Sequence, residues 1–513
     1  MKKLLLASFF IFPISFLNAQ AYDSLNSNNI TAAFNADGIM FSANASPFNH
    51  IISPGNGISY SIANLWIGGY DQHGDLHVSA QTYRQSGTDF WPGALDTNSV
   101  SCTSIQSNHY NRLWKLNCSE VDSFVSYLQG QGGPGYSVPM DIQTWPGNGQ
   151  VSAGEEQYLA PFIDADADGY YNWTAGDYPI ARGDQSLFYV YNDSLVGNTH
   201  TESQGKSLGM EIEAMPYEFN RPWDDALMNT VFIHYTIVNH SQEIYDSTRI
   251  GFWSDFDLGN SAMNRVGSDS ILSASYHYSQ NDAVGIIFLN TPMNNTIAYG
   301  NNFGFTGNPS TSDDYYDYLK GRWKDGSHLT FGSNGYGGSV SSNWMFSGDP
   351  VSNSGWNDVG GGDRRVIGST NDFILQPILR YTFDVAMVVV HDTGSNFACV
   401  QTLKQRMQVI KNFYATESQF CVPGITSIHE TSINSPSNSV FPIPANTQIT
   451  LQTSNEQPQQ FTIYSVAGTK VMEGKTNGIS TQLDIHQLPL GMYFIQVAGD
   501  HSNQMLKFIK SGD

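Results

Sequence analysis

The chain has 513 residues and a formal net charge of −23, from 23 basic and 46 acidic side chains, and only 13% of its residues are charged. The scarcity of Lys and Arg excludes a nucleic-acid partner, because phosphate contacts need basic side chains. An aromatic content of 13% excludes a disordered chain. With 48 glycines, this composition is typical of an exported, mostly β protein.

Residues 1–20 have the pattern of a cleaved signal peptide. Lys2 and Lys3 form a positive start, residues 4–17 form an apolar segment, and Ala19 and Ala21 offer small-residue cleavage positions. The apolar segment is shorter than the roughly 20 residues that a membrane-spanning helix needs. No later segment is long and apolar enough to span, so we expect no transmembrane segment. Cleavage removes two basic residues and leaves a net charge of −25.

In the N-terminal part, residues 65–70 and 75–80 read as two strands of a hairpin around a Gly74 turn. Apolar residues at helical spacing after Ser119 predict a helix with Ser119 as its N-cap, ended by the glycines of residues 130–135.

The later body is dominated by runs of Val, Ile, Tyr, Phe and Thr with Gly, Asn and Asp between them. These runs predict strands at 186–191, 231–238, 250–253, 284–289 and 380–390. Apolar residues that step by three and four predict one helix over residues 400–414. Near the C-terminus, alternation of apolar and polar residues predicts a small all-β module.

We therefore expect a mostly β fold: a β-sandwich-type body with few helices and a small C-terminal Ig-like β-sandwich. The expected organisation is a signal peptide (1–20), an N-terminal β-rich region (21–160), an Asp-rich calcium loop (161–185), a β-rich domain with a C-terminal helix (186–421), a linker (422–440) and a C-terminal domain (441–513).

The chain has four cysteines, and an exported chain meets oxidising conditions, so two disulfides are expected. Three connectivities are possible. The simplest pairs neighbours in sequence, Cys102 with Cys118 and Cys399 with Cys421. Zinc is disfavoured because no cysteine pair has Cys-x-x-Cys spacing.

The most chemically distinctive stretch is an Asp-rich turn. Asp164, Asp166 and Asp168 can converge on one hard cation if the chain turns sharply at Gly169. Further oxygen ligands are expected from the Tyr170 carbonyl, Asn172 and Asp177. The stretch lacks the position-12 Glu of an EF-hand, where Ala175 stands, and resembles the Asp-rich calcium loops of extracellular repeat modules. We expect structural Ca²⁺ here, against the alternative of a solvated acidic turn.

A second metal candidate combines Asp255 and Asp257, which lie on one side of a strand, with Asp269. The alternative is that these carboxylates make turn hydrogen bonds. No His-Glu-x-x-His, Gly-x-Ser-x-Gly, Walker or Gly-x-Gly-x-x-Gly motif is present. Glu202, Glu211 and Glu213 are nominal acids for glycoside hydrolysis, and Tyr315, Tyr316, Tyr318 and Trp323 are a candidate sugar-stacking surface.

The C-terminal domain resembles the type A sorting domain of the type IX secretion system. The resemblance rests on four stretches in order, residues 441–446, 461–471, 488–495 and 507–510, behind a linker and a signal peptide. Ile443 stands where the family usually has Asn. The resemblance implies a secreted or cell-surface protein that crosses the outer membrane of a Gram-negative bacterium, with the outer-membrane secretion machinery as partner.

The body resembles an uncharacterised secreted family found with this sorting domain, through stretches such as residues 66–69, 89–93 and 362–365. This resemblance does not imply any enzymatic activity. The sequence therefore favours a calcium-stabilised, non-enzymatic adhesion or binding scaffold that contacts surface glycan or extracellular matrix. A secreted polysaccharide-active enzyme and a glycan-binding module are the alternatives.

Overall fold

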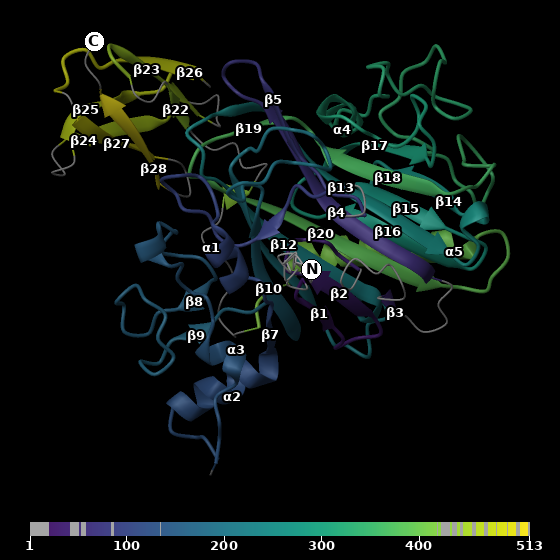
Figure 1. Ribbon diagram of the computed structural model, residues 1–513, viewed down its shortest axis with the longest axis horizontal. Coiled ribbons are helices and arrows are strands. Elements are labelled where there is room, and N and C mark those ends of the chain that lie inside the picture. Colours follow the sequence, from purple (N-terminus) through teal and green to yellow (C-terminus); the bar gives the residue numbers. More distant parts are fainter. Residues whose placement is uncertain are drawn as a thin grey trace, which may run out of the picture. The chain divides into compact units, whose positions relative to one another are not determined.

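The computed structural model divides the chain into two compact units, Met1–Ile428 and His429–Asp513 (Figure 1). In the first unit, the body, the described residues are 20–41, 51–52, 58–83, 87–133, 135–417 and 419–421. In the second they are 431–432, 439–441, 445–453, 458–465, 470–478, 480–489, 491–498 and 503–510. The expected signal peptide, apart from Gln20, and most of the expected linker lie outside the described residues.

The strands of the body are β1 (Tyr22–Leu25), β2 (Thr31–Asn35), β3 (Ile51–Ile52), β4 (Ile58–Tyr70), β5 (Leu76–Ser79), β6 (Trp91–Pro92), β7 (Trp114–Asn117), β8 (Phe162–Ile163), β9 (Tyr178–Pro179), β10 (Gln185–Asn192), β11 (Met210–Glu218), β12 (Thr230–Asn239), β13 (Tyr245–Leu258), β14 (Arg265–Asp269), β15 (Ala274–Tyr278), β16 (Asp282–Phe288), β17 (Met293–Gly300), β18 (Arg364–Thr370), β19 (Phe373–Leu375) and β20 (Arg380–His391). Its helices are α1 (Ser104–His109), α2 (Cys118–Leu128), α3 (Met140–Gln143), α4 (Ser312–Leu319) and α5 (Ala398–Thr416), with 3-10 turns at η1 (Val151–Ala153), η2 (Leu227–Asn229) and η3 (Ser261–Met263).

The body is a mostly β, sandwich-type structure. Its larger antiparallel sheet has the order β14-β15-β16-β20-β12-β11-β10-β6, with β7 also pairing β10. The smaller sheet has the order β17-β18-β13-β4-β5, with β19 also pairing β13, and β1-β2-β3 form a further small sheet. Strands from residues 21–160 therefore pair with strands from residues 186–421, so both segments build the same two sheets.

The side-chain alternation of β13 shows how the layers stack. Ser254 and Phe256 face the larger sheet, where the Ser254 hydroxyl lies 3.1 Å from His277 Nε2 and the Phe256 ring lies 5.2 Å from the His277 ring. The other face of the smaller sheet is covered by α4. Gly251 of β13 permits this close approach, because a Cβ there would stand 2.5 Å from Leu319 Cδ2 of α4. The larger sheet is covered on its outer face by α5.

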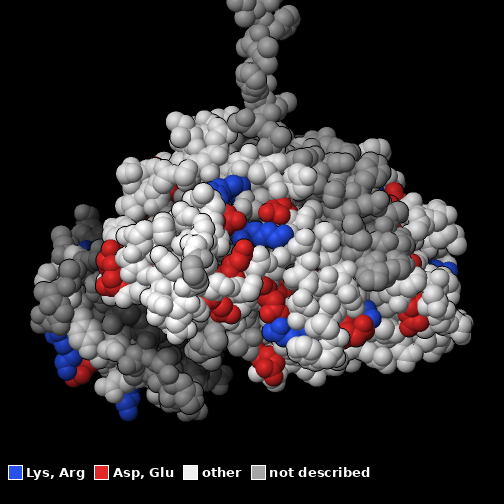
Figure 2. Space-filling view, turned by 90° about the horizontal axis from the view of Figure 1, so that it is seen from below, with Lys and Arg blue, Asp and Glu red and all other residues white. Residues whose placement is uncertain are grey.

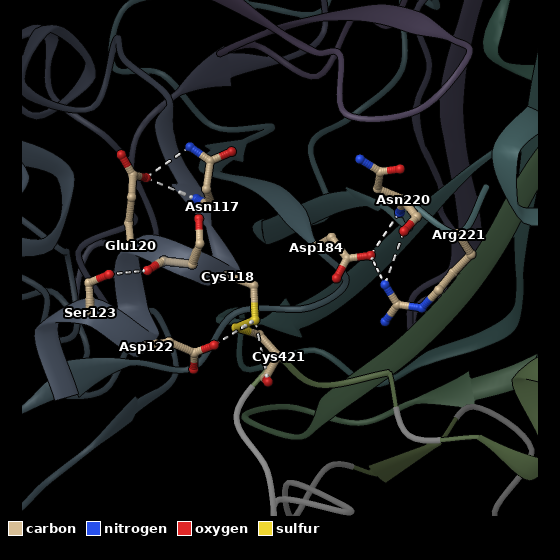
Figure 3. Close-up of a disulfide and its surroundings, with 10 residues drawn as sticks. Asn117, Cys118, Glu120, Asp122, Ser123, Asp184, Asn220, Arg221 and Cys421 are labelled. Carbon is tan, nitrogen blue, oxygen red and sulfur yellow. Dashed lines mark hydrogen bonds and ion pairs between the residues drawn. A yellow bond between two sulfur atoms is a disulfide. The ribbon is translucent and has the colours of Figure 1, made fainter. Parts of the chain in front are cut away.

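The predicted strands and the longest predicted helix are confirmed. The hairpin joins β4 to β5, and α5 buries Val400, Leu403, Met407 and Ile410 against the larger sheet, as the spacing of three and four predicts. The predicted N-cap of α2 is wrong. Asn117 caps the helix, and the Glu120 carboxylate accepts a hydrogen bond from the Asn117 backbone N–H at 3.1 Å (Figure 3).

The predicted local disulfides are also wrong. Cys118 pairs with Cys421, with their Cα atoms 5.5 Å apart, whereas Cys102 and Cys399 are buried free thiols. The bridge is drawn in Figure 3. Helix α5 explains the error, because its 19 residues span about 28 Å and separate Cys399 from Cys421. A disulfide needs Cα atoms within about 7 Å.

The second unit contains β21 (Thr431–Ser432), β22 (Ser439–Phe441), β23 (Gln448–Gln452), β24 (Gln460–Ser465), β25 (Lys470–Lys475), β26 (Ser480–Asp484), β27 (Gly491–Ala498) and β28 (Asn503–Lys510). Two sheets, β22-β23-β26 and β25-β24-β27-β28, enclose an apolar core that includes Leu451, Ile463, Ile495 and Phe508. This unit is the expected small β-sandwich.

Charge is spread thinly over the molecule. Figure 2 shows one face on which most side chains are uncharged and most of the few Lys and Arg residues lie near Asp or Glu. Among the described residues, no helix is both long enough and apolar enough to span a bilayer.

Candidate metal centres

The Asp-rich stretch forms a loop between two short paired strands, β8 and β9. Asp164, Asp166 and Asp168 each place a carboxylate oxygen within 4.8 Å of the others. The turn is closed by backbone N–H groups. Gly169 donates to Asp164 Oδ2 at 2.8 Å and adopts a φ of +83°, a conformation that favours glycine. The three predicted carboxylates therefore converge as the spacing requires.

Electrostatics around this turn favour a bound cation. Desolvation and then repulsion from Asp168 raise the pKa of Asp166, so the third negative charge is disfavoured when no positive charge is near. A divalent cation removes that repulsion, and hard oxygen ligands suit Ca²⁺.

The remaining predicted ligands, Asp177, Asn172 and Tyr170, make hydrogen bonds that stabilise the loop. Asp177 is buried, and its two oxygens accept hydrogen bonds from the backbone N–H groups of Ala165 at 2.8 Å and Asn172 at 2.7 Å. The Asn172 amide oxygen accepts from the Thr174 hydroxyl at 2.7 Å. The Tyr170 side chain is exposed, and its backbone N–H donates to Asp168 at 2.7 Å. These contacts hold the loop in the conformation that gathers the three Asp residues.

A second carboxylate cluster differs from the predicted one. Asp255 and Asp257 do lie together, but the third member is Asp363, again with ligand oxygens within 4.8 Å of one another. Asp269 instead lies 3.0 Å from the Lys404 ammonium. No spacing signal connects Asp363 with Asp255, because the register of β18 on β13 brings them together.

The surroundings of Asp255 are unusual for a carboxylate. It is 3% exposed, and its Oδ2 accepts a hydrogen bond from the Tyr83 hydroxyl at 2.5 Å and lies 3.3 Å from Arg365 Nε. Its Oδ1 is buried with no hydrogen-bond partner. Burial raises the pKa of Asp255 to about 7, although Arg365 opposes that shift.

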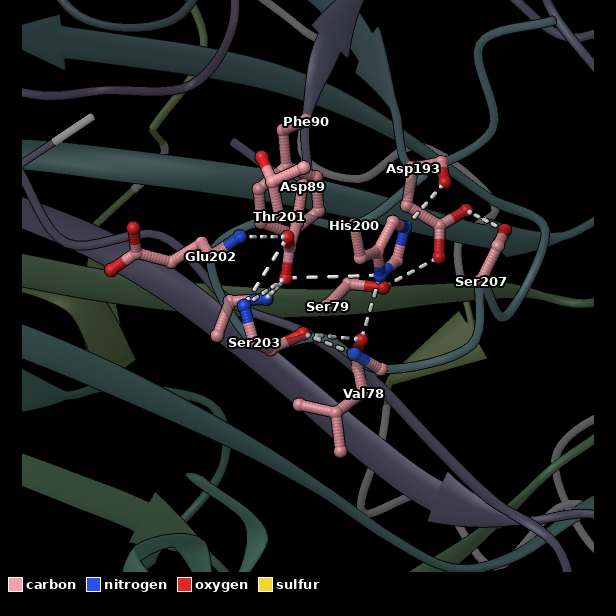
Figure 4. Close-up of polar contacts among 12 residues, drawn as sticks. Val78, Ser79, Asp89, Phe90, Asp193, His200, Thr201, Glu202, Ser203 and Ser207 are labelled. Atoms are coloured by element: carbon pink, nitrogen blue, oxygen red, sulfur yellow. Dashed lines mark hydrogen bonds and ion pairs between the residues drawn. The ribbon is translucent and has the colours of Figure 1, made fainter. Parts of the chain in front are cut away.

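A buried ion network that the sequence reading missed surrounds His200 (Figure 4). Its ring nitrogens lie 2.9 Å from the Val78 carbonyl and 2.8 Å from the Asp193 carbonyl, and carbonyls only accept. Satisfying both contacts requires the doubly protonated ring, and Asp89 lies 3.7 Å away as its counter-charge. Burial lowers the pKa of His200, but Asp89 and Asp193 more than offset this, so it is raised.

In the same network, the Asp193 carboxylate stabilises the loop that joins β10 to β11. The carboxylate accepts hydrogen bonds from the Ser79 hydroxyl at 2.6 Å, the Ser207 hydroxyl at 3.0 Å and the backbone N–H groups of Leu208 and Met210, each at 2.7 Å. Because four protein donors already occupy both oxygens of this carboxylate, we interpret the network as structural.

The nominal acids Glu211 and Glu213 belong to another buried cluster. Arg380 contacts Glu213 and lies 3.0 Å from Glu156, and His240 Nε2 lies 3.6 Å from Glu211. Burial raises the pKa of Glu213 to about 8 against the effect of Arg380. These carboxylates are engaged in ion pairs, which favours a structural role over catalysis.

The predicted sugar-stacking residues Tyr315, Tyr316, Tyr318 and Trp323 are all buried in the core. Four exposed aromatic side chains lie in this region. Phe303 (93% exposed), Phe305 (59%) and Tyr336 (37%) are what we call the aromatic patch, whereas the ring of Phe331 (54%) contacts the buried Trp356. The Phe305 and Tyr336 rings stack with centroids 6.3 Å apart. All four lie in the segment 301–363, which joins β17 to β18 and which we call the insert.

Residues 439–511 match the family described as "Secretion system C-terminal sorting domain". The C-terminal unit is a secretion-system sorting domain. The sorting domain implies contact with the secretion machinery and supports a secreted or cell-surface location, as expected from the sequence. No curated protein matches the chain.

Similarity to solved structures is distant. A polysaccharide lyase is 8% identical with a TM-score of 0.19, and the match covers 70% of this chain and 37% of the lyase. A putative aldose 1-epimerase from Escherichia coli K12 is 11% identical with a TM-score of 0.20, over 46% of this chain and 77% of that one. The chain thus spans little more than a third of the lyase, and TM-scores this low carry no functional argument.

Proposed function

We propose that this protein is an exported binding protein, carried across the outer membrane of a Gram-negative bacterium by its sorting domain. Its body is a calcium-stabilised, non-enzymatic scaffold, and the aromatic patch on the insert contacts a surface or matrix glycan. The observation that carries the proposal is the stacked pair of exposed rings, Phe305 and Tyr336, with the exposed Phe303 two residues before Phe305. Exposed apolar surface of this kind on a folded protein marks interaction sites.

The surroundings of the patch favour an uncharged polar ligand. The Tyr336 hydroxyl donates to Asp325 at 2.7 Å, which fixes the orientation of the ring. The nearby Lys324 ammonium is occupied by the Asn308 carbonyl at 2.7 Å and by Asp314 at 3.5 Å. Flat exposed rings, one of them held in orientation through its hydroxyl, suit sugar rings, which present both apolar faces and hydroxyls.

Affinity electrophoresis and pull-down with insoluble and soluble polysaccharides test this proposal. The double variant Phe303→Ala/Phe305→Ala is expected to lose retention while keeping the circular dichroism spectrum and melting temperature of the wild type. Trp223→Ala is the matched control, because Trp223 is 81% exposed and lies outside the insert. Equal retention of the wild type and the double variant on every glycan contradicts the proposal. Binding of a protein partner instead, lost in the same variant, makes the patch a protein-docking surface.

One observation favours a polysaccharide-active enzyme as the second candidate. Glu202 is 5% exposed, its Oε2 is buried without a hydrogen-bond partner, and its Oε1 accepts from the Tyr315 hydroxyl at 2.9 Å. Burial raises the pKa of Glu202, as a general acid requires. Release of reducing ends that is abolished by Glu202→Gln supports this reading. No product from the folded wild type excludes it for the glycans used.

A further inference from the structure

A surface cavity of about 530 Å³ lies where the insert meets α5 and the turn between β14 and β15 (Figure 1). The insert contributes a turn that Asp349 and Ser354 close with two backbone hydrogen bonds, of 2.8 and 3.0 Å. The turn after β14 is attached to α5, because the Lys411 ammonium donates to the Leu272 carbonyl at 3.1 Å. Pockets that bind small ligands or single side chains have volumes of about 300–1,000 Å³, and this cavity lies within that range.

The apolar part of the cavity lining is aliphatic. Leu272 and Val400 belong to the core cluster between α5 and the larger sheet, and Val351 of the insert packs against the same cluster. Ile271 also lines the cavity and is 87% exposed, so it forms part of the rim. A floor of this kind suits an aliphatic group, because apolar contact is non-directional and grows with the area that is buried.

The charged groups of the lining are already paired within the protein. The Lys404 ammonium lies 3.0 Å from Asp269 Oδ2, and Asp269 Oδ1 accepts hydrogen bonds from two backbone N–H groups of its own turn, each at 3.1 Å. Asp349 accepts from the Ser352 hydroxyl at 2.5 Å and from the Ser352 backbone N–H at 3.3 Å. A charged ligand would lose water here without gaining a free counter-charge, so the lining favours an uncharged one.

The polar groups that remain for a ligand are neutral amides. Gln401 and Gln405 are exposed, and neither side chain is hydrogen-bonded to another residue in the described part of the chain. Because residues four apart share one face of a helix, both amides belong to the same wall of the cavity. Each amide offers two N–H donors and one acceptor oxygen.

We propose that this cavity binds one aliphatic side chain of an extended, uncharged peptide segment of a protein partner. The side chain lies on Leu272, Val351 and Val400, and the backbone amides beside it pair with Gln401 and Gln405. A backbone amide offers one donor and one acceptor, and a glutamine amide matches both. The cavity and the aromatic patch share no residue, so this inference goes beyond the proposed function.

Saturation-transfer NMR and titration calorimetry of the full chain with capped tripeptides test the proposal. N-acetyl-Ser-Leu-Ser-amide is expected to bind, whereas the acidic N-acetyl-Ser-Glu-Ser-amide is not. The double variant Gln401→Ala/Gln405→Ala is expected to bind the leucine peptide about tenfold more weakly, because it loses two hydrogen bonds, and alanine preserves the helix. Gln131→Ala/Gln150→Ala is the matched control, because it removes two exposed amides outside the cavity, and it should bind like the wild type.

Ile271→Ser, at the exposed rim, is a second variant that is expected to weaken binding of the leucine peptide. Equal affinity of the wild type and the glutamine double variant overturns the proposal, and so does a leucine peptide that does not bind. Loss of binding in Phe303→Ala/Phe305→Ala but not in the glutamine variant also overturns it, and moves the peptide site to the aromatic patch. Binding of N,N′-diacetylchitobiose instead of the peptide, lost in the glutamine variant, overturns the peptide as the ligand.

Discussion

Cys118 and Cys421 are joined by a disulfide although 303 residues separate them along the chain. Cys118 begins α2, and Cys421 follows α5, where its backbone N–H donates to the Ala181 carbonyl at 2.9 Å. The bridge therefore closes a loop that includes most of both sheets, and it fastens the end of the body immediately before the segment that leads to the sorting domain.

Removing this bridge is expected to destabilise the body. The double variant Cys118→Ser/Cys421→Ser loses the restriction that the disulfide places on the unfolded chain, which is typically worth about 2–5 kcal/mol for a native bridge. Guanidinium denaturation of both proteins without reductant measures the difference. The same free energy of unfolding in the variant and the wild type contradicts a stabilising role.

The number of reactive thiols distinguishes this pairing from two local disulfides. Burial raises the pKa of both Cys102 and Cys399 to about 12, so in the native protein both are expected to react very slowly with a thiol reagent. After denaturation without reductant, two thiols per chain should react, and four after reduction. If no thiol reacts before reduction, the second pair of cysteines is also bridged.

Stability is expected to fall as the pH rises because of buried carboxylates such as Glu218. Burial raises its pKa to about 7, although hydrogen bonds from Ser27 oppose the shift. Between about pH 4.3, the pKa of an unfolded Glu, and pH 7, the folded state keeps a proton that the unfolded state loses. The folded state is therefore favoured at low pH, and the penalty above pH 7 reaches about 4 kcal/mol.

Glu218→Gln removes this titration while keeping an oxygen that accepts from Ser27. Urea denaturation at pH 4.5 and pH 8 is expected to show a smaller loss of stability in the variant than in the wild type. Some pH dependence remains in the variant, because burial also raises the pKa of Glu213 to about 8 and that of Asp255 to about 7. An equal loss in both proteins means that Glu218 is not the group that titrates.

The strands and α5 were predictable because their signals are local. In α5, Val400, Leu403, Met407 and Ile410 recur at helical spacing and are all buried. The loop carboxylates were found for the same reason, since Asp164, Asp166 and Asp168 are two residues apart around a glycine turn. A pattern within a few residues needs no knowledge of the rest of the fold.

The missed features are contacts between distant segments. Asp363 reaches Asp255 only through the pairing of β18 with β13, and Cys421 reaches Cys118 only after both sheets have formed. The length of the helix after Cys399 already argued against a local bridge to Cys421. His200 and Asp89 carried no signal in the sequence, because a buried ion pair depends on which loops the sheets bring together.

Calcium is expected to stabilise the body through the Asp164–Asp168 loop. A ligand at a hundredfold excess over its Kd adds about 2.7 kcal/mol to the folded state. Added Ca²⁺ should raise the melting temperature of chelator-stripped protein, and EDTA should reverse the shift. Asp166→Asn should reduce this shift, whereas Asp313→Asn, an exposed carboxylate on α4, should not. A shift of the same size in Asp166→Asn and the wild type argues against the loop site.

The loop after β10 depends on the Asp193 carboxylate. Four donors converge on it, two hydroxyls and two backbone N–H groups. Asp193→Asn replaces one acceptor oxygen with an NH₂ group, which turns a donor toward other donors in a buried site. Leaving buried donors unpaired costs about 1–3 kcal/mol for each group, and more when a charged acceptor is lost.

We therefore expect Asp193→Asn to lower the unfolding free energy by several kcal/mol and to speed tryptic cleavage after Lys206, which lies in this loop. Asp75→Asn is the matched control, because Asp75 pairs with the same Lys206 at 2.6 Å on the exposed surface. Exposed ion pairs contribute about 0–1 kcal/mol, so this variant should leave both measurements almost unchanged. If the two variants lose equal stability, the Asp193 contacts are no stronger than a surface pair, and the loop is held by other contacts.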